Sequence, residues 1–273
     1  MSNLAKRTIT GAIYVLSVVL AIYLDPRVTS IYFFVVSMIG LWEFYQVSKA
    51  KGDIKPNKYV GFLLGILTYC MFASLVFDGI LLKIGMLGCI LIFFYLLVYE
   101  LLIEPNHPFT NIAYTVLGVV YVVVPFGFVN LIVHYYNVSY APILMSLFIF
   151  VWCNDTFAYL VGRKLGKHKL FERISPKKTW EGSLGGLVFT IISAVVVSLF
   201  FKELSVLELV LIAVAVAVVG TFGDLIESMF KRQMGVKDSG NILPGHGGIL
   251  DRFDSMITVL LFMGFLTILS MTC

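Results

Sequence analysis

Residues Ser228–Ser255 read SMFKRQMGVKDSGNILPGHGGILDRFDS, and this polar segment lies between two apolar runs, Val206–Phe222 and Ser255–Met271. Each apolar run is close to the roughly 20 residues that a helix needs to cross a bilayer. The pattern therefore predicts two transmembrane helices joined by a charged loop at one membrane surface. The ionisable residues of that loop are Lys231, Arg232, Lys237, Asp238, His246, Asp251, Arg252 and Asp254.

The whole chain has the composition of an integral membrane protein. Hydrophobic residues make up 59% of its 273 residues and charged residues only 13%, and the mean hydropathy is +0.95. These values exclude an ordinary soluble domain, and no nucleic-acid partner is expected. Nine apolar runs predict an all-α, polytopic protein with about nine transmembrane helices, at Ile9–Leu24, Val28–Val47, Tyr59–Phe77, Ile80–Leu102, Ile112–Tyr135, Ala141–Val161, Leu184–Phe201, Val206–Phe222 and Ser255–Met271.

The distribution of Lys and Arg predicts the orientation in the membrane, because basic residues stay on the cytoplasmic side. With a cytoplasmic N-terminus, seventeen of the 20 basic residues fall on that side, and only Arg27, Lys83 and Lys202 fall on the other. The two basic loops, Gly162–Ser183 and Gly223–Asp254, are then cytoplasmic, and the C-terminus is outside. The cell membrane is the expected location.

Residues 1–273 are predicted to form a single membrane-embedded domain, in which residues 1–140 are mainly scaffold and lipid-facing helices. Residues 141–273 carry the polar chemistry, in helices and cytoplasmic loops. In the first part, the small residues Gly61 and Gly65 predict a close approach of two helices. Pro125 predicts a kink in the fifth helix, since proline lacks a backbone donor. The four cysteines have no paired spacing and are expected to be packing residues: Cys70, Cys89, Cys153 and Cys273.

Two acidic clusters flank the loop. If the helix that begins at Val206 continues past the membrane, one of its faces carries residues spaced at i, i+3, i+4 and i+7, namely Asp224, Glu227, Ser228 and Lys231. Asp251, Asp254 and Ser255 repeat the spacing at the start of the next helix. Carboxylates with few histidines near them suit a hard cation such as Mg²⁺. The alternative is that these acids pair with Lys231, Arg232 and Arg252 to cap helices.

Two further loop segments are candidates for ligand binding. The turn Pro244–Gly248 precedes a helix start, where backbone amides favour anions, although an ordinary glycine turn has the same residues. The second basic loop either attracts anionic lipid headgroups or forms a phosphate clamp, with Ser175, Pro176, Lys177, Lys178, Thr179, Trp180, Glu181 and Gly182.

Asn154 and Asp155 lie inside the sixth predicted span, where a charge must face protein or water. Asp155 therefore either pairs with a lysine or lines the site. Glu43, near the end of the second span, is a weaker case of the same kind.

Residues 228–254 resemble the signature of the phosphatidate cytidylyltransferases, also called CDP-diacylglycerol synthases. The shared pattern is S, two residues, K-R, four residues, K-D, five residues, P-G-H-G-G, two residues and D-R-x-D. Further blocks are similar to that family at NDTFAY (Asn154–Tyr159), SPKKTWEG (Ser175–Gly182) and GDLIES (Gly223–Ser228). The resemblance covers roughly the last 120 residues strongly, with Trp42–Glu43 as one shared point before them.

The resemblance implies the reaction of CTP with phosphatidate to give CDP-diacylglycerol and pyrophosphate, with Mg²⁺ at two divalent sites, one of them shared with a monovalent cation. Phosphatidate would be taken from the cytoplasmic leaflet, and a homodimer is implied. Asp224 and Asp251 are expected to hold Mg²⁺, with Glu227, Asp254 and Asp155 beside them. The phosphates are expected to meet Lys231, Lys237, Arg232, Lys177 and Lys178. Other expected substrate contacts are Ser175, Thr179, Glu181, Ser228, Asn154, Arg252, His246, Gly247 and Gly248.

Two other functions remain open at this stage. A CTP-dependent polyprenol kinase would release CDP in place of pyrophosphate, and the full signature would not be expected in it. A transporter of an anionic solute or lipid would place its binding groups near the bilayer midplane, whereas most of the charge here is expected at one face.

Overall fold

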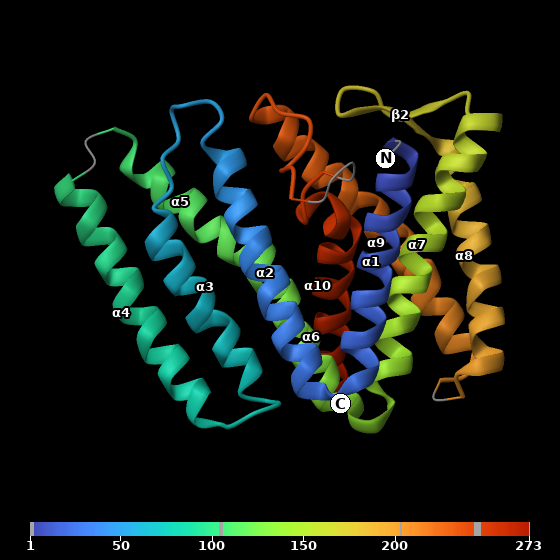
Figure 1. The fold of residues 1–273 in the computed structure, drawn as a ribbon, viewed down its shortest axis with the longest axis horizontal. Helices are drawn as coiled ribbons and strands as arrows, with labels where there is room; N and C mark the ends of the chain where they lie inside the picture. The colour runs from blue at the N-terminus through green and yellow to red at the C-terminus, as the bar shows by residue number, and fades with distance from the viewer. Residues whose placement is uncertain (1–2, 104–105, 203, 243–246, 273) are drawn as a thin grey trace.

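The computed structural model describes residues 3–103, 106–202, 204–242 and 247–272, with side chains from residue 8 onward. The predicted all-α class is confirmed, with one small hairpin added (Figure 1). The elements are α1 (Asn3–Leu24), α2 (Pro26–Ser48), α3 (Lys58–Ala73), α4 (Ile80–Ile103), α5 (Pro108–Gly118), η1 (Val119–Val123), α6 (Val124–Tyr136), η2 (Asn137–Ser139), α7 (Tyr140–Leu165), β1 (Lys169–Phe171), β2 (Ser175–Thr179), α8 (Trp180–Phe200), α9 (Val206–Gln233) and α10 (Leu250–Thr272).

Six segments of the described chain are long and apolar enough to cross a membrane, namely Pro26–Ser48, Ile80–Ile103, Pro108–Leu165, Trp180–Phe200, Val206–Gln233 and Leu250–Thr272. Pro108–Leu165 is 58 residues long and turns back at Asn137, whose φ of 48° breaks the helix. Thr8–Leu24 and Lys58–Ala73 are shorter apolar helices. The predicted membrane character is therefore present along the whole chain.

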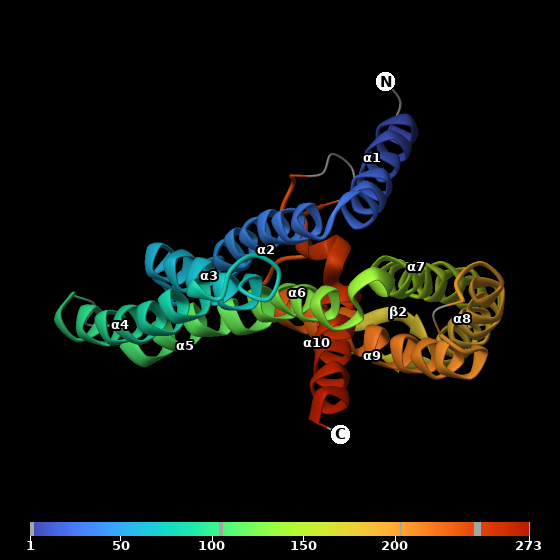
Figure 2. The same ribbon diagram turned by 90° about the horizontal axis from the view of Figure 1, so that it is seen from below.

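The helices lie side by side, with α3 and α4 at one edge of the molecule and α8 at the other (Figure 1). Seen from below, α10 occupies the centre and α1 stands apart from α8 and α9 (Figure 2). The hairpin, the α2–α3 connection and the α9–α10 connection all lie at the end of the bundle where α1 begins. The chemistry-bearing loops are thus gathered at one end.

Four buried phenylalanines join the helices around the centre. The ring of Phe33 on α2 stacks on Phe126 of α6 and Phe148 of α7, with centroids 6.0 and 6.1 Å apart. Phe253 of α10 meets Phe126 edge-on at 5.3 Å and Phe148 at 6.2 Å. Such aromatic pairs add to the stabilisation from burial. They hold the first turns of α10 against the middle of the bundle.

The packing details predicted for the first part of the chain are present. A side chain at Gly65 would meet Leu41 of α2 at 2.9 Å, and one at Gly61 would collide with the Tyr45 hydroxyl. The irregularity expected near Pro125 takes the form of a π-helical turn, η1, directly before it. A proline and a widened turn are common causes of a local break in a long helix.

Replacing Gly61 by Ala is expected to destabilise the protein by about 1–3 kcal/mol, the usual range for overpacking a filled core. Tyr45 cannot move aside easily, because it is 1% exposed and donates a hydrogen bond to the Thr115 carbonyl at 2.7 Å. Thermal unfolding in detergent measures the effect. Gly79→Ala is the matched control, since nothing lies within 4 Å of a methyl group there; equal melting temperatures for the two variants would contradict the expectation.

Candidate active site

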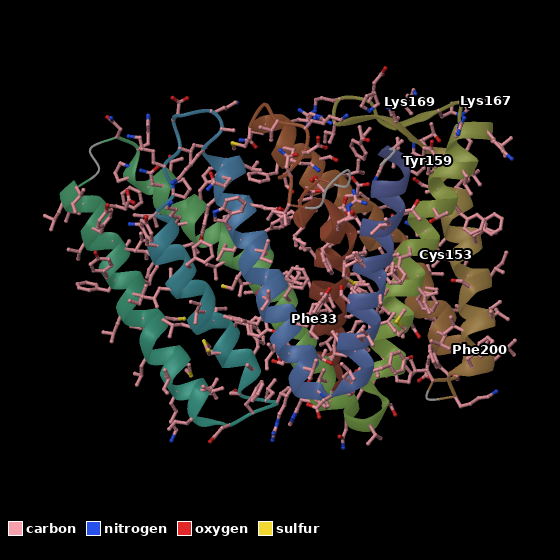
Figure 3. All side chains as sticks on the ribbon, viewed as in Figure 1. Phe33, Cys153, Tyr159, Lys167, Lys169 and Phe200 are labelled. Carbon is pink, nitrogen blue, oxygen red and sulfur yellow. The ribbon has the colours of Figure 1, made fainter. Side chains whose placement is uncertain are left out.

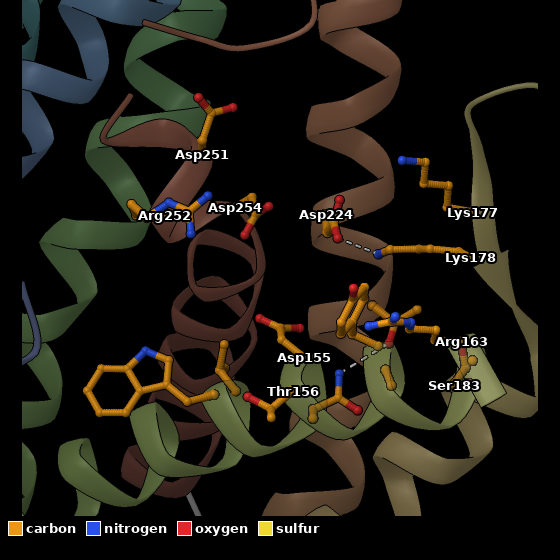
Figure 4. A pocket seen from close by; sticks show the side chains of 18 of the residues that line it. Asp155, Thr156, Arg163, Lys177, Lys178, Ser183, Asp224, Asp251, Arg252 and Asp254 are labelled. Atoms are coloured by element: carbon orange, nitrogen blue, oxygen red, sulfur yellow. Dashed lines mark hydrogen bonds and ion pairs between the residues drawn. The ribbon is translucent and has the colours of Figure 1, made fainter. Parts of the chain in front are cut away.

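A cavity of about 930 Å³ lies between α1, α7, α8, α9, α10 and the hairpin (Figure 4). Charged side chains line it, and a charge inside an apolar bundle must be matched by another charge, a polar group or water. Acidic and basic side chains both contribute. The charged lining residues are Asp155, Arg163, Lys169, Lys177, Lys178, Asp224, Asp251, Arg252 and Asp254.

Carboxylates from three different helices face one another across the cavity. Asp155 on α7, Asp224 on α9 and Asp254 on α10 lie around the same space in Figure 4. The Asp224 carboxylate is 2.6 Å from the Lys178 ammonium of β2 and accepts a 3.1 Å hydrogen bond from the Ser228 hydroxyl. The predicted continuation of α9 is therefore confirmed, because Asp224 and Ser228 share one face of it.

Lys231 lies between two buried carboxylates at the side of this cavity. Its ammonium group is 3.0 Å from Glu227 and 2.6 Å from Asp251. Lys231 is 7% exposed and Glu227 only 1%. Two anions and one cation are thus enclosed together, and the contacts join α9 to α10. Of the two interpretations of these acids, the structure shows the pairing with Lys231. A contact of Lys231 with phosphate stays a prediction.

Asp251 also organises the connection that precedes α10. Its second carboxylate oxygen accepts hydrogen bonds from the Ser239 amide at 2.9 Å, the Ser239 hydroxyl at 3.1 Å and the Gly248 amide at 2.8 Å. The Gly248 amide, expected to meet phosphate, is therefore used inside the protein. Gly247 has a φ of 81°, a conformation that favours glycine. The remainder of the predicted turn, including His246, lies outside the described residues.

The hairpin brings basic residues over the cavity. β1 and β2 pair antiparallel, with Lys169 opposite Thr179. The Thr179 hydroxyl accepts the Gly182 amide at 3.2 Å and so caps the N-terminus of α8. Figure 3 shows Lys167 and Lys169 at this end of the molecule, and Lys169, Lys177 and Lys178 line the cavity. The helix start that the sequence predicted here is present.

The Glu181 carboxylate fastens the base of the hairpin. It accepts the Lys167 amide at 3.0 Å and lies 2.6 Å from Nδ1 of His168. Carboxylates are favoured in the first turn of a helix, where the amides are unpaired. In this geometry Glu181 holds the residues that precede the hairpin, Lys167 and His168. Its contact with substrate stays a prediction.

The cavity brings together about half of the predicted site residues, namely Asn154, Asp155, Lys177, Lys178, Thr179, Asp224, Asp251, Arg252 and Asp254. Ser228 and Lys231 lie behind its wall and contact the lining residues Asp224 and Asp251, and Glu227 contacts Lys231. Arg232 and Lys237 are exposed, and Arg232 donates to the Val236 carbonyl at 3.1 Å. Ser175, Glu181, Arg232 and Lys237 are not among the cavity-lining residues.

Sequence reasoning missed several lining residues. Arg163 and Lys169 belong to the second basic loop but were not among the predicted site residues, because nothing in their spacing sets them apart. Thr10 and Tyr14 belong to α1, an apolar helix without a motif. Tyr14 packs edge-on against Trp152 and Phe253, with centroids 6.2 and 5.4 Å away. Only the fold could reveal that α1 forms one wall of the cavity.

Known proteins are similar in sequence to this chain over nearly its whole length. The cytidylyltransferase family matches residues 5–269. The chain is 36% identical over 260 residues to a phosphatidate cytidylyltransferase of Staphylococcus haemolyticus, covering 93% of this chain and 95% of that protein. It is 33% identical over 276 residues to one of Bacillus subtilis, covering 97% and 98%. The chain belongs to the cytidylyltransferase family.

Substituting Lys231 by Ala is expected to lower the free energy of unfolding by about 3 kcal/mol, because it leaves buried carboxylates without their cation. Thermal unfolding in detergent, with the folded fraction followed by size-exclusion chromatography, tests this. Lys237→Ala serves as the control, since Lys237 is exposed. The role of Lys231 as a buried counterion is wrong if both variants unfold at the wild-type temperature.

Proposed function

We propose that this protein is a phosphatidate cytidylyltransferase, which converts CTP and phosphatidate to CDP-diacylglycerol and pyrophosphate. The observation that carries the proposal is the cavity at one end of an apolar bundle, where carboxylates of α7, α9 and α10 face the lysines of the hairpin. A lipid phosphate and a water-soluble triphosphate can meet only at such an interface. Family membership and the names of the relatives support the same activity.

The chemistry requires positioning and charge neutralisation more than proton abstraction. The second pKa of a phosphomonoester is roughly 6, so the lipid phosphate is largely a dianion at neutral pH. One of its oxygens attacks the α-phosphorus of CTP, and the bond from that phosphorus to the bridging oxygen breaks as pyrophosphate leaves. Lys177, Lys178, Arg163 and Arg252 line the cavity and are assigned to the phosphates, whose mutual repulsion they offset.

The cavity also fits a divalent cation. Its acidic ligands offer only oxygen atoms, which Mg²⁺ prefers. Mg²⁺ takes one or two carboxylates from the protein and completes its shell with water and substrate phosphate. Bound there, Mg²⁺ would neutralise charge on the triphosphate.

We assign the metal first to Asp224 and Asp251, with Asp155 and Asp254 next to them. All four line the cavity, and this exceeds the one or two carboxylates that a single Mg²⁺ takes, so a second cation site is included in the proposal. Glu227 pairs with Lys231, which in turn pairs with Asp251. We therefore assign Glu227 the role of holding Lys231 and not of binding the metal directly. Lys178, now paired with Asp224, is expected to turn to the phosphates when the metal binds.

We further propose nine transmembrane helices, a cytoplasmic N-terminus and an outside C-terminus, in the cell membrane. The two apolar helices α1 and α3, and the turn at Asn137 within Pro108–Leu165, make nine crossings from the six candidate segments. The positive-inside rule supports the orientation, since the basic loops lie at one end of the bundle. Phosphatidate then comes from the cytoplasmic leaflet. A homodimer is included on the family resemblance alone.

Purified protein incubated with phosphatidate, radiolabelled CTP and Mg²⁺ is expected to transfer label into the organic phase as CDP-lipid and to release pyrophosphate. EDTA is expected to abolish the transfer. Asp224→Asn is expected to lower kcat by about 100-fold or more, because a charge that acts in the transition state is removed. Glu208→Gln, at the far end of α9 in its N-terminal cap, is the control and should retain activity.

Each alternative has its own outcome in this assay. Release of CDP in place of pyrophosphate would indicate a lipid kinase, and flux across proteoliposomes without CTP turnover would indicate a transporter. Undiminished product formation by Asp224→Asn would rule out the metal role of that residue.

The orientation is tested by single cysteines in a variant from which the native cysteines have been removed. Asp53→Cys lies in the α2–α3 connection and Asp78→Cys in the α3–α4 connection; both positions are exposed and lie at opposite ends of the bundle. A membrane-impermeant thiol reagent is expected to label Asp78→Cys in intact bacterial cells and Asp53→Cys only after permeabilisation. The reverse pattern would invert the proposed topology.

A further inference from the structure

Glu43 is a buried carboxylate that the proposed chemistry does not use. It lies on α2, is 0% exposed and reaches the first residues of α10, more than 200 positions later in the chain. Its two oxygens accept hydrogen bonds from the backbone amides of Ile249 and Leu250, each at 2.9 Å. The first amides of a helix have no partner within the helix, and a negative charge there is favourable. Glu43 therefore caps α10 from another helix.

A hydroxyl group connects this cap to the site. The Ser239 hydroxyl oxygen lies 3.0 Å from a Glu43 oxygen and 3.1 Å from an Asp251 oxygen, so the two carboxylates share its single proton. The Ser239 amide donates a separate hydrogen bond to Asp251 at 2.9 Å. Asp251 in turn holds the Lys231 ammonium at 2.6 Å. An unbroken chain of polar contacts thus runs from α2 to the cavity wall.

Two glycines leave the space that the Glu43 carboxylate occupies. A side chain at Gly240 would come within 2.7 Å of a Glu43 oxygen, and one at Gly248 would collide with the Glu43 carboxylate and the Ser239 hydroxyl. Neither glycine has a positive φ, so space and not conformation is what requires glycine at these positions. The α9–α10 connection is shaped around this one carboxylate.

We infer that Glu43 is a positioning residue for the proposed cytidylyl transfer, on which this role rests. It sets the place where α10 begins, and the first turn of α10 carries Asp251, Arg252 and Asp254 to the cavity. Glu43 itself is not among the residues that line the cavity. It acts through the backbone of Ile249 and Leu250 and through Ser239.

The first test compares Glu43→Gln with Glu100→Gln. The amide of Gln keeps the shape of the side chain but replaces one acceptor with a donor that faces a backbone amide. Glu100 is the matched control, because it is also a buried glutamate (1% exposed) that accepts a hydrogen bond, from Asn111 at 3.2 Å, and it lies on α4 far from the cavity (Figure 1).

With Glu43→Gln, kcat is expected to fall by about 10- to 100-fold, the effect of misplacing reacting groups by about an ångström. The Mg²⁺ concentration for half-maximal activity is expected to rise, because Asp251 and Asp254 move with α10. Glu100→Gln is expected to keep both values within about twofold of the wild type, since distant sites without shared partners act independently. Wild-type kcat and Mg²⁺ dependence in Glu43→Gln, or a loss matched by Glu100→Gln, would overturn the positioning role.

A measurement that does not depend on the activity separates the two proposals. Hydrogen exchange of the intact protein in detergent is expected to be faster at residues 248–252 in Glu43→Gln than in the wild type or Glu100→Gln. If the wild-type protein did not turn over CTP, the proposed function would be overturned. Hydrogen exchange would still decide whether Glu43 positions α10. Unchanged exchange in Glu43→Gln would overturn that placement.

A double-mutant cycle with Gly248→Ala adds a second probe of the same contact. The methyl group is expected to push the Glu43 carboxylate aside and to lower kcat alone, but to have a smaller effect in Glu43→Ala, where the carboxylate is gone. Contacting residues couple in this way, whereas independent ones add. Strictly additive effects would contradict the shared space. If Glu43→Ala does not fold, the comparison of Glu43→Gln with Glu100→Gln still tests the positioning role.

Discussion

Burying charge inside an apolar bundle requires that each polar atom find a partner within the protein, since a lone buried charge is far too costly. The rest of this structure depends on how that requirement is met around Asp251. Its carboxylate takes an ammonium group, two amides and a hydroxyl. These contacts bind the end of α9, the connection after it and the start of α10 into one unit, and the cavity is formed on the side of that unit.

The limits of the helices show what the sequence can and cannot predict. The apolar run predicted for α9 ends at Phe222, but the spacing of Asp224, Glu227, Ser228 and Lys231 indicated one face of a longer helix, and the helix does continue to Gln233. Glu227 and Lys231 can lie in it because they meet partners inside the protein. The run predicted for α10 begins at Ser255, and the helix begins at Leu250. Its cap comes from Glu43, and no local pattern can reveal a partner so distant in the chain. The hydropathy of the sequence predicts the apolar part of a helix, but it does not predict the polar contacts that extend the helix beyond that part.

The candidate site divides in the same way. Asp224, Asp251, Asp254 and Lys178 were identified from spacing and motif, and the fold brings them to one cavity. Tyr14 comes from an apolar helix without a motif, and Glu43 was noted only as an acid near the end of a span, with no partner indicated. Their contributions depend on which helices become neighbours, and the spacing of residues in a single sequence does not show this. The first part of the chain is thus scaffold with specific tasks: one helix closes the cavity and another fixes the position of its acidic wall.

The cap on α10 also has a consequence for biogenesis. Chains emerge from the ribosome N-terminus first, so α2 enters the membrane while the residues that satisfy Glu43 have not yet been synthesised. Until α10 arrives, that carboxylate must keep contact with water or hold a proton. The last helix therefore completes the burial of Glu43 on the second helix, and a chain that stopped before Ile249 would leave this buried acid without its two backbone donors.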